Sequence, residues 1–168
     1  IRGKGNDTLS FENINNGVLL DFVFGIGTFD EVDALGAISE NGDGIGEVIY
    51  FVLEGCVRLF YNVDGLEKTA FFYTEGDFIC AGESYNLEIP AIENYQAIED
   101  SIVVHFDKRL NEKLMDSFPV FQNIALIATE NELIACQKML ASFITKSPTE
   151  RYLNLLETNG ALFLRVPQ

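Results

Sequence analysis

Side chains that commonly perform catalysis are few or widely separated in this sequence. The only histidine, His105, lies in an apolar segment, and the three cysteines, Cys56, Cys80 and Cys136, have no CxxC spacing. A metal enzyme built on a small β-barrel needs two or three histidines with a carboxylate, and a nucleophilic serine or cysteine needs a neighbouring base. We therefore expect no catalytic residues and no metal site, and we interpret His105 and the cysteines as structural residues.

One short segment has the composition of a ligand site. It runs from Cys80 through Gly82 and Glu83 to Ser84. A helical turn that begins near Gly82 would present backbone N–H groups, which can hold an anion. Glu83 could then accept hydrogen bonds from sugar hydroxyls. The simpler interpretation is a strand–turn–strand corner with a solvated glutamate, and the residues by themselves leave both open.

The charge of the chain excludes one class of partner. The chain has 26 acidic and 11 basic residues, a net charge of −15, and residues 5–107 alone hold 20 acids and two bases. Nucleic-acid binding needs clustered cations, so this part would repel phosphates. No apolar run reaches the roughly 18 residues of a membrane span. With no visible secretion signal and an odd number of dispersed cysteines, we expect a cytoplasmic protein without disulfides.

The front of the chain is rich in turns. Thirteen of the 14 glycines lie at or before Gly82, and glycine is common in turns and disfavoured inside helices. Asp64-Gly65 separates two strand-like runs, residues 57–63 and 66–73, which predicts a β-hairpin. Further strand-like runs are residues 48–53, 78–80 and 102–106. Short strands at this spacing predict an antiparallel jelly roll or β-barrel. Residues 1–46 are expected to form loops with a short helix or strand.

The back of the chain has a helical period. Apolar residues recur there every seven positions in adjacent pairs: Leu126, Ile127, Leu133, Ile134, Leu140 and Ala141. They predict one long helix over residues 120–145 with a wide apolar stripe. The stripe could pack on the barrel of its own chain or face the same helix of a second copy. The length of the helix favours the second copy, because a small barrel cannot cover it all.

A second helix is predicted to begin at Pro148. Ser147 and Glu150 have the spacing of a capping box, proline suits the first helical position, and Gly160 is placed to end the helix. The fold class is therefore β-rich α+β: an antiparallel roll, then a long helix and a short helix.

A set of short motifs runs from residue 40 to the end of the chain. They are ENGD (40–43), IYFVLEGCVRLFY (49–61), DG (64–65), KT (68–69), EGDF (75–78), FP (118–119), PTERYL (148–153) and RVPQ (165–168). In this order they resemble the cyclic nucleotide-binding domain of Crp/Fnr-type bacterial transcription regulators and the helices that follow it. The segment before residue 40 departs from the usual pattern of that family.

The resemblance implies a sensor, a dimerising helix and a DNA-reading winged helix-turn-helix. We expect a β-roll sensor domain over residues 1–107, a dimerisation helix region over 108–146, and the start of a DNA-binding domain over 147–168. In relatives, RVPQ leads directly into the helix-turn-helix. We therefore expect the DNA-binding module to be missing from this sequence and DNA contact to depend on it. A homodimer through the long helix is the expected partner.

The resemblance also names the ligand site. Relatives that bind cyclic AMP use a Gly-Glu pair, similar to Gly82-Glu83, and an arginine about eight residues later that holds the cyclic phosphate. That slot falls near Ala91 or Ile92, and no lysine or arginine occurs from residue 76 to residue 107. Loss of a charge-assisted contact to a phosphate costs orders of magnitude in affinity.

We therefore expect a degenerate site that binds cyclic AMP weakly, with no cofactor, and that holds another small-molecule effector or none. Its candidate residues are Gly82, Glu83, Ser84, Ile92 and Asn94. The alternatives are a ligand-free dimeric scaffold and, less favoured, a cupin-like enzyme.

Overall fold

A computed structural model describes residues 28–32, 37–39 and 48–165 of the chain. The chain divides into two compact units, Ile1–Leu110 and Asn111–Gln168, which are taken in turn. The first contains the strands and one short helix. The second contains the helices that follow.

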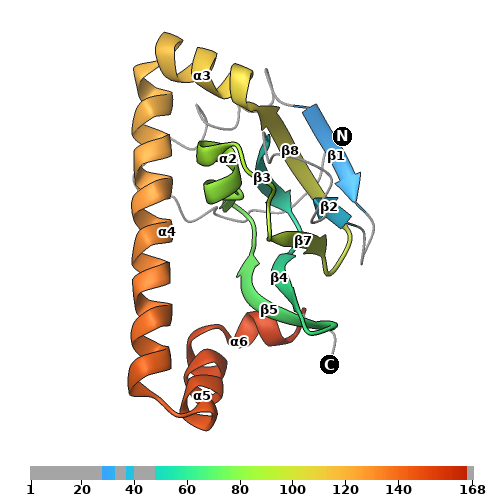
Figure 1. Ribbon diagram of the computed structural model, residues 1–168, viewed down its shortest axis with the longest axis vertical. Helices are drawn as coiled ribbons and strands as arrows, with labels where there is room; N and C mark the ends of the chain where they lie inside the picture. The colour runs from blue at the N-terminus through green and yellow to red at the C-terminus, as the bar shows by residue number, and fades with distance from the viewer. Residues whose placement is uncertain (1–27, 33–36, 40–47, 166–168) are drawn as a thin grey trace. The chain divides into compact units, whose positions relative to one another are not determined.

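The first unit is built on two antiparallel sheets (Figure 1). Its elements are β1 (Thr28–Val32), β2 (Ala37–Ser39), β3 (Val48–Glu54), β4 (Val57–Val63), β5 (Leu66–Tyr73), β6 (Phe78–Ile79), α2 (Gly82–Leu87), β7 (Asn94–Ala97) and β8 (Ser101–Asp107). One sheet has the strand order β1-β8-β3-β6 and the other β2-β7-β4-β5. The predicted antiparallel roll is confirmed. Of the poorly patterned residues 1–46, the described part forms β1 and β2, and the rest lies outside the described residues.

The hairpin between β4 and β5 follows the predicted boundaries. Val63 pairs with Leu66, and the two turn residues between them have positive φ angles, 54° at Asp64 and 79° at Gly65. Positive φ at both positions gives the turn the twist of the flanking strands. The bonded strands continue to the pair Val57 and Tyr73.

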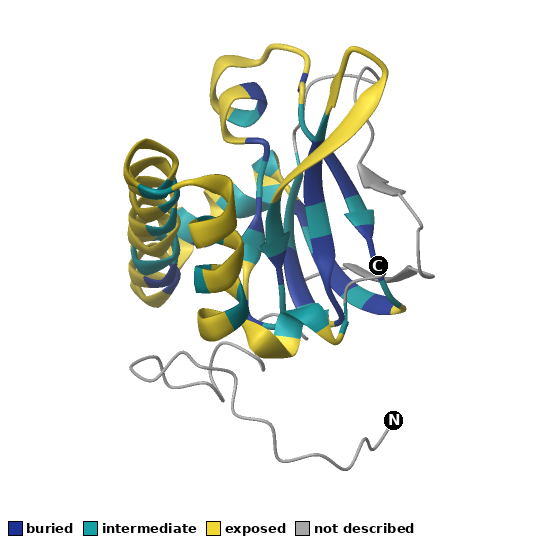
Figure 2. Cartoon of the chain, turned by 90° about the horizontal axis from the view of Figure 1, so that it is seen from below, coloured by how far each residue is buried: buried dark blue, intermediate teal, exposed yellow. Residues whose placement is uncertain are grey.

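The core of the roll is apolar and draws on both sheets. Figure 2 shows buried residues gathered on the strands. The central cluster consists of Val52, Val57, Leu59, Tyr73, Ile79, Ala81, Ala91, Tyr95 and Val103. Tyr50, Tyr61 and Phe71 pack against it while keeping part of their surface exposed. This cluster includes Ala81 and Ala91, which lie on either side of α2, so the core fixes both ends of that segment.

The second unit is helical apart from short links. Its helices are α3 (Lys108–Ser117, which begins in the first unit), α4 (Pro119–Thr145), α5 (Pro148–Thr158) and α6 (Gly160–Phe163). The long helix and the second helix were predicted from the sequence, and α4 begins one residue earlier than expected.

The start of α5 has the predicted capping box. The Glu150 amide donates to Ser147 Oγ over 3.3 Å, and the Ser147 amide donates to Glu150 Oε2 over 2.8 Å. α5 ends at Thr158, two residues before Gly160, as predicted, and Gly160 is itself the first residue of α6. Asn159 provides the C-cap, since its amide donates to the Leu155 carbonyl.

Two connections between the sheets meet at Gly55. The link from β3 to β4 and the link from β7 to β8 both cross from one sheet to the other, and the Ile98 amide donates to the Cys56 carbonyl over 2.8 Å where they meet. Gly55 has a φ of +103°, and a Cβ there would lie 2.1 Å from Ser101 Oγ and 2.7 Å from its Cα. A side chain cannot fit without moving the backbone of one link.

We therefore expect Gly55→Ala to destabilise the chain by about 3 kcal/mol, from backbone strain and a steric clash together. Gly65→Ala is the matched control, because Gly65 also has a positive φ but has nothing within 4 Å of the added Cβ. Backbone strain alone should cost it about 1 kcal/mol. Urea unfolding midpoints measure both, and equal losses in the two variants would contradict the packing argument.

Candidate functional site

The segment between β6 and β7 forms a helix rather than a simple corner. α2 begins at Gly82, as the ligand-site interpretation expects, and Ala81 before it gives no side-chain cap. The first turn is held by the Tyr85 amide, which donates to the Ala81 carbonyl over 2.8 Å. Gly82 and Glu83 are exposed in this turn. The structure thus presents these two residues at the surface, at the start of a short helix.

Ser84 has a structural contact. Its side chain is buried, with 1% of the residue exposed, and Oγ donates to the Ile89 carbonyl over 2.5 Å. The Glu88 amide donates to the Ser84 carbonyl over 2.9 Å, with Glu88 in the left-handed region at a φ of 56°. These bonds close the loop that follows α2. The Ser84 hydroxyl therefore uses its one proton inside the protein.

The two other candidate residues differ in burial. Asn94, the first residue of β7, is 5% exposed, and its Nδ2 donates to the Phe60 carbonyl on β4 over 3.3 Å. Ile92 is 58% exposed. Ala91, the other position of the expected arginine slot, is 7% exposed and belongs to the core cluster. The slot thus offers one inward and one outward position, and neither has a charged side chain.

A thiol and a carboxylate lie close together beside α2. Burial raises the pKa of the Cys80 thiol to about 11, and the negative charge of Glu93 adds to the shift. Glu93 precedes β7, and its Oε2 accepts a hydrogen bond from the Ile92 amide over 3.1 Å. The surroundings of the slot are therefore acidic, which disfavours a bound anion. Glu93 was not among the sequence candidates, although its position next to Ile92 could have suggested it.

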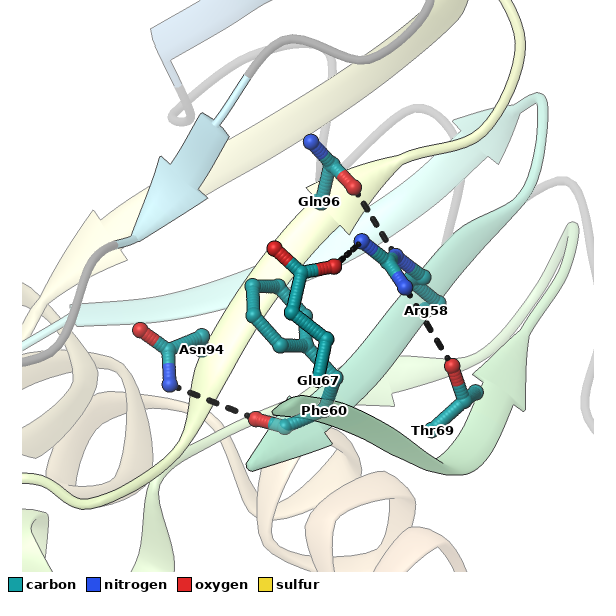
Figure 3. Close-up of polar contacts among 6 residues, drawn as sticks. All are labelled: Arg58, Phe60, Glu67, Thr69, Asn94 and Gln96. Atoms are coloured by element: carbon teal, nitrogen blue, oxygen red, sulfur yellow. Dashed lines mark hydrogen bonds and ion pairs between the residues drawn. The ribbon is translucent and has the colours of Figure 1, made fainter. Parts of the chain in front are cut away.

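Arg58 on β4 is engaged in contacts between strands (Figure 3). Arg58 on β4 donates from Nε to Gln96 Oε1 on β7 over 2.8 Å, and from Nη1 to Thr69 Oγ1 on β5 over 3.4 Å. Its Nη2 pairs with Glu67, and its guanidinium lies 4.3 Å from the centre of the Phe60 ring. Arg58 therefore ties β4 to both of its neighbours.

The predicted interface residues lie along α4 and are largely exposed. Leu126 and Leu133 are each 56% exposed, Leu140 is 62% exposed and Ile134 is 46% exposed. Ala141 is also exposed, and Ile127 is partly buried. The structure thus leaves most of the predicted stripe uncovered in one copy of the chain.

No group of three or more histidine, cysteine or acidic residues in the described ranges is placed to hold a metal ion. No helix of the described chain is long and apolar enough to cross a bilayer.

Comparison with known families identifies the fold of the roll. Residues 37–118 match the family model described as the cyclic nucleotide-binding domain. These residues have the cyclic nucleotide-binding fold. The match includes β2 to β8, α2 and α3, and thus every candidate ligand residue. No curated protein matches the sequence.

Solved structures of bacterial regulators share this fold. The catabolite activator protein of Thermus thermophilus is 23% identical with a TM-score of 0.58, over 74% of this chain and 59% of that chain. The c-di-GMP-responsive regulator CLP of Xanthomonas campestris is 15% identical with a TM-score of 0.68, over 85% and 71%. A CooA variant of Carboxydothermus hydrogenoformans is 17% identical with a TM-score of 0.63, over 93% and 99%. This chain thus spans 59% of the length of the Thermus protein, and at these identities the likeness concerns the fold.

The environment of Cys80 predicts slow alkylation. With a pKa of about 11 the thiol has roughly a hundredfold less thiolate at pH 8 than an ordinary cysteine, and its reaction with iodoacetamide should keep accelerating up to pH 10. Mass spectrometry of the labelled peptide measures the rate, with urea-unfolded protein as the reference. Glu93→Gln should accelerate labelling only modestly, because burial is the larger cause. If the Glu93→Gln variant were labelled as fast as the unfolded protein, burial would not be the main cause of the raised pKa, and the assignment would be wrong.

Proposed function

We propose that this chain is the sensory and dimerisation part of a Crp/Fnr-like bacterial transcription regulator, without enzymatic activity. The observation that carries the proposal is the order of its parts. A cyclic nucleotide-binding roll is followed by a helix of 27 residues that exposes leucines at a spacing of seven. Solved regulators, among them the catabolite activator protein and CLP, share this fold.

The proposed partner is a second copy, bound through α4. Seven residues make almost two helical turns, so Leu126, Leu133 and Leu140 lie along one side of the helix. Each has more than half of its surface exposed in one copy. In a parallel two-fold dimer each leucine would meet its own counterpart, and burial of these side chains would stabilise the pair. Ile127, Ile134 and Ala141 would widen the same interface.

The proposed ligand site does not favour a cyclic nucleotide. A phosphate needs donors, but Ser84 and Asn94 direct theirs to the carbonyls of Ile89 and Phe60. Arg58 is held between strands, and the carboxylate of Glu93 lies beside the slot. What favours a ligand is the exposed start of α2 at Gly82 and Glu83. We therefore propose weak binding of cyclic AMP, and an effector other than an anionic nucleotide if there is one.

A ligand-free dimeric scaffold is the second candidate. The observation in its favour is the packing of Tyr50, Tyr61 and Phe71 against the core cluster, which also includes Ala91 from the slot. Ala91, one of the two positions of the expected arginine slot, is thus part of the packed core. The roll would then serve only to support the dimer and a partner.

DNA contact, in this proposal, belongs to a module outside the acidic roll. Residues 5–107 have 20 acids and two bases and would repel a phosphate backbone. The proposed location of the protein is the cytoplasm, where a regulator of transcription meets bacterial DNA.

Calorimetry with cyclic AMP and cyclic GMP tests the site. We expect no heat of binding up to millimolar nucleotide, because residues 76–107 contain no lysine or arginine that could pair with the phosphate. Ile92→Arg is the matched variant, since Ile92 is 58% exposed and can accept a longer side chain. A charge-assisted bond of about 1.5–3 kcal/mol should improve affinity roughly ten- to a hundredfold.

Micromolar binding by the unmodified chain would contradict the degenerate site. It would show that the backbone N–H groups of α2 hold the phosphate without a cation. Absence of binding in both the unmodified chain and Ile92→Arg would favour the ligand-free scaffold.

Sedimentation tests the dimer. Leu133→Glu or Ile134→Glu should convert the dimer to monomers, because each places a charge in the proposed apolar seam. Asn131→Glu is the control for Leu133→Glu, because it adds the same charge about 200° around the helix from Leu133 and off the line of leucines. A dimer that survives the first two substitutions, or that is lost equally with Asn131→Glu, would contradict the assignment of this face.

A further inference from the structure

One lysine connects α2 to the beginning of α3. Lys108 is the first residue of α3, and its Nζ donates to the Tyr85 carbonyl over 3.2 Å and to Glu88 Oε1 over 3.0 Å. The same Nζ lies 5.4 Å from the centre of the Tyr85 ring. All of these residues belong to the first compact unit. A single ammonium group thus makes three contacts with the C-terminal end of α2.

These contacts provide a hydrogen-bond donor for a carbonyl at the C-terminal end of α2 that has no donor within the helix. The last four carbonyls of a helix have no partner within it, and a cation is favoured at that end. The Tyr85 carbonyl is one of the four. Glu88 is the C-cap residue, and its left-handed backbone, with a φ of 56°, is uncommon for a residue other than glycine. Lys108 therefore binds both the helix end and the residue that terminates it.

α2 is short and mostly exposed. Ser84 is its one buried residue, held through the bond to the Ile89 carbonyl, and Asn86 is exposed and donates from Nδ2 to the Gly82 carbonyl over 2.7 Å. A helix of six residues has little stability of its own. Short elements with few buried contacts open more readily than the strands of a core. The Lys108 contacts are thus a major part of what holds the C-terminal end of α2.

We infer that Lys108 couples the position of α2 to that of α3. When α2 shifts or opens, Lys108 must either move with it or lose its three contacts, and Lys108 is also the first residue of α3. The Leu110 amide, which donates to Asp107 Oδ1 over 2.7 Å, fixes the start of α3 on the end of β8. A disturbance of α2 is thereby passed to the first turn of α3. The coupling of α2 to α3 does not depend on the proposed function. Only its use in sensing an effector rests on that proposal.

Hydrogen exchange measures the coupling without any ligand. In the full chain, Lys108→Met keeps the apolar part of the side chain and removes the ammonium group. Amides of residues 85–88 and 112–114 should then exchange roughly five- to tenfold faster, while those of β4 and β8 keep their rates. Lys113→Met, at an exposed lysine of the same helix, is the matched control and should change neither segment.

A double-mutant comparison then tests transmission itself. Ser84→Ala, or the milder Asn86→Ala, weakens α2 and should accelerate exchange at residues 112–114 when Lys108 is present. In the Lys108→Met background the same substitutions should affect α2 alone. Equal effects at residues 112–114 in both backgrounds would overturn the coupling, as would a uniform acceleration that includes β4 and β8. Neither result bears on nucleotide binding, so the coupling and the proposed function can fail separately.

Discussion

The close approach of Gly55 to Ser101 is the constraint on which the roll depends. The link from β3 to β4 and the link from β7 to β8 both pass between the two sheets, and they meet where a Cβ on Gly55 would lie 2.1 Å from Ser101 Oγ. The Gly55 amide donates to Glu75 Oε1 over 3.0 Å, which joins the end of β5 to the same place. With the sheets fixed here, β6 and β7 have defined positions, and the segment between them, which contains α2, is confined to one side of the core.

The same segment bears on the proposal that this chain binds a cyclic nucleotide weakly. The polar groups that could have bound a phosphate have partners in the protein: Ser84 closes the loop after α2, Asn94 bonds β4, and Arg58 ties three strands together. Each of these bonds stabilises the roll. The groups left at the surface, Glu83 among them, are acidic. A preserved architecture is consistent with the proposed change of the site, because the core depends on apolar packing while the site depends on a few polar side chains.

Features governed by neighbouring residues were predictable from the sequence. The Asp64-Gly65 turn needs two positive φ angles, and the capping box of Ser147 and Glu150 depends on a spacing of three, so both could be read directly. Short elements were harder. β7 has four residues and no alternating pattern, and α2 has six, so neither gives a clear periodic signal. The contact of Lys108 with Glu88 spans 20 positions, and no local pattern indicates it.

The sequence by itself determined the antiparallel roll, the long helix with its apolar stripe, the acidic charge, and the lack of a cation near Ile92. These follow from composition and from periods of two and seven residues, which act over short distances along the chain. Only the tertiary structure decided that Ala91 faces the core while Ile92 is exposed, that Ser84 and Asn94 donate to backbone carbonyls, and that Lys108 binds α2. Those outcomes depend on which distant segments the folded core brings together, because burial and hydrogen bonding are settled by neighbours in space.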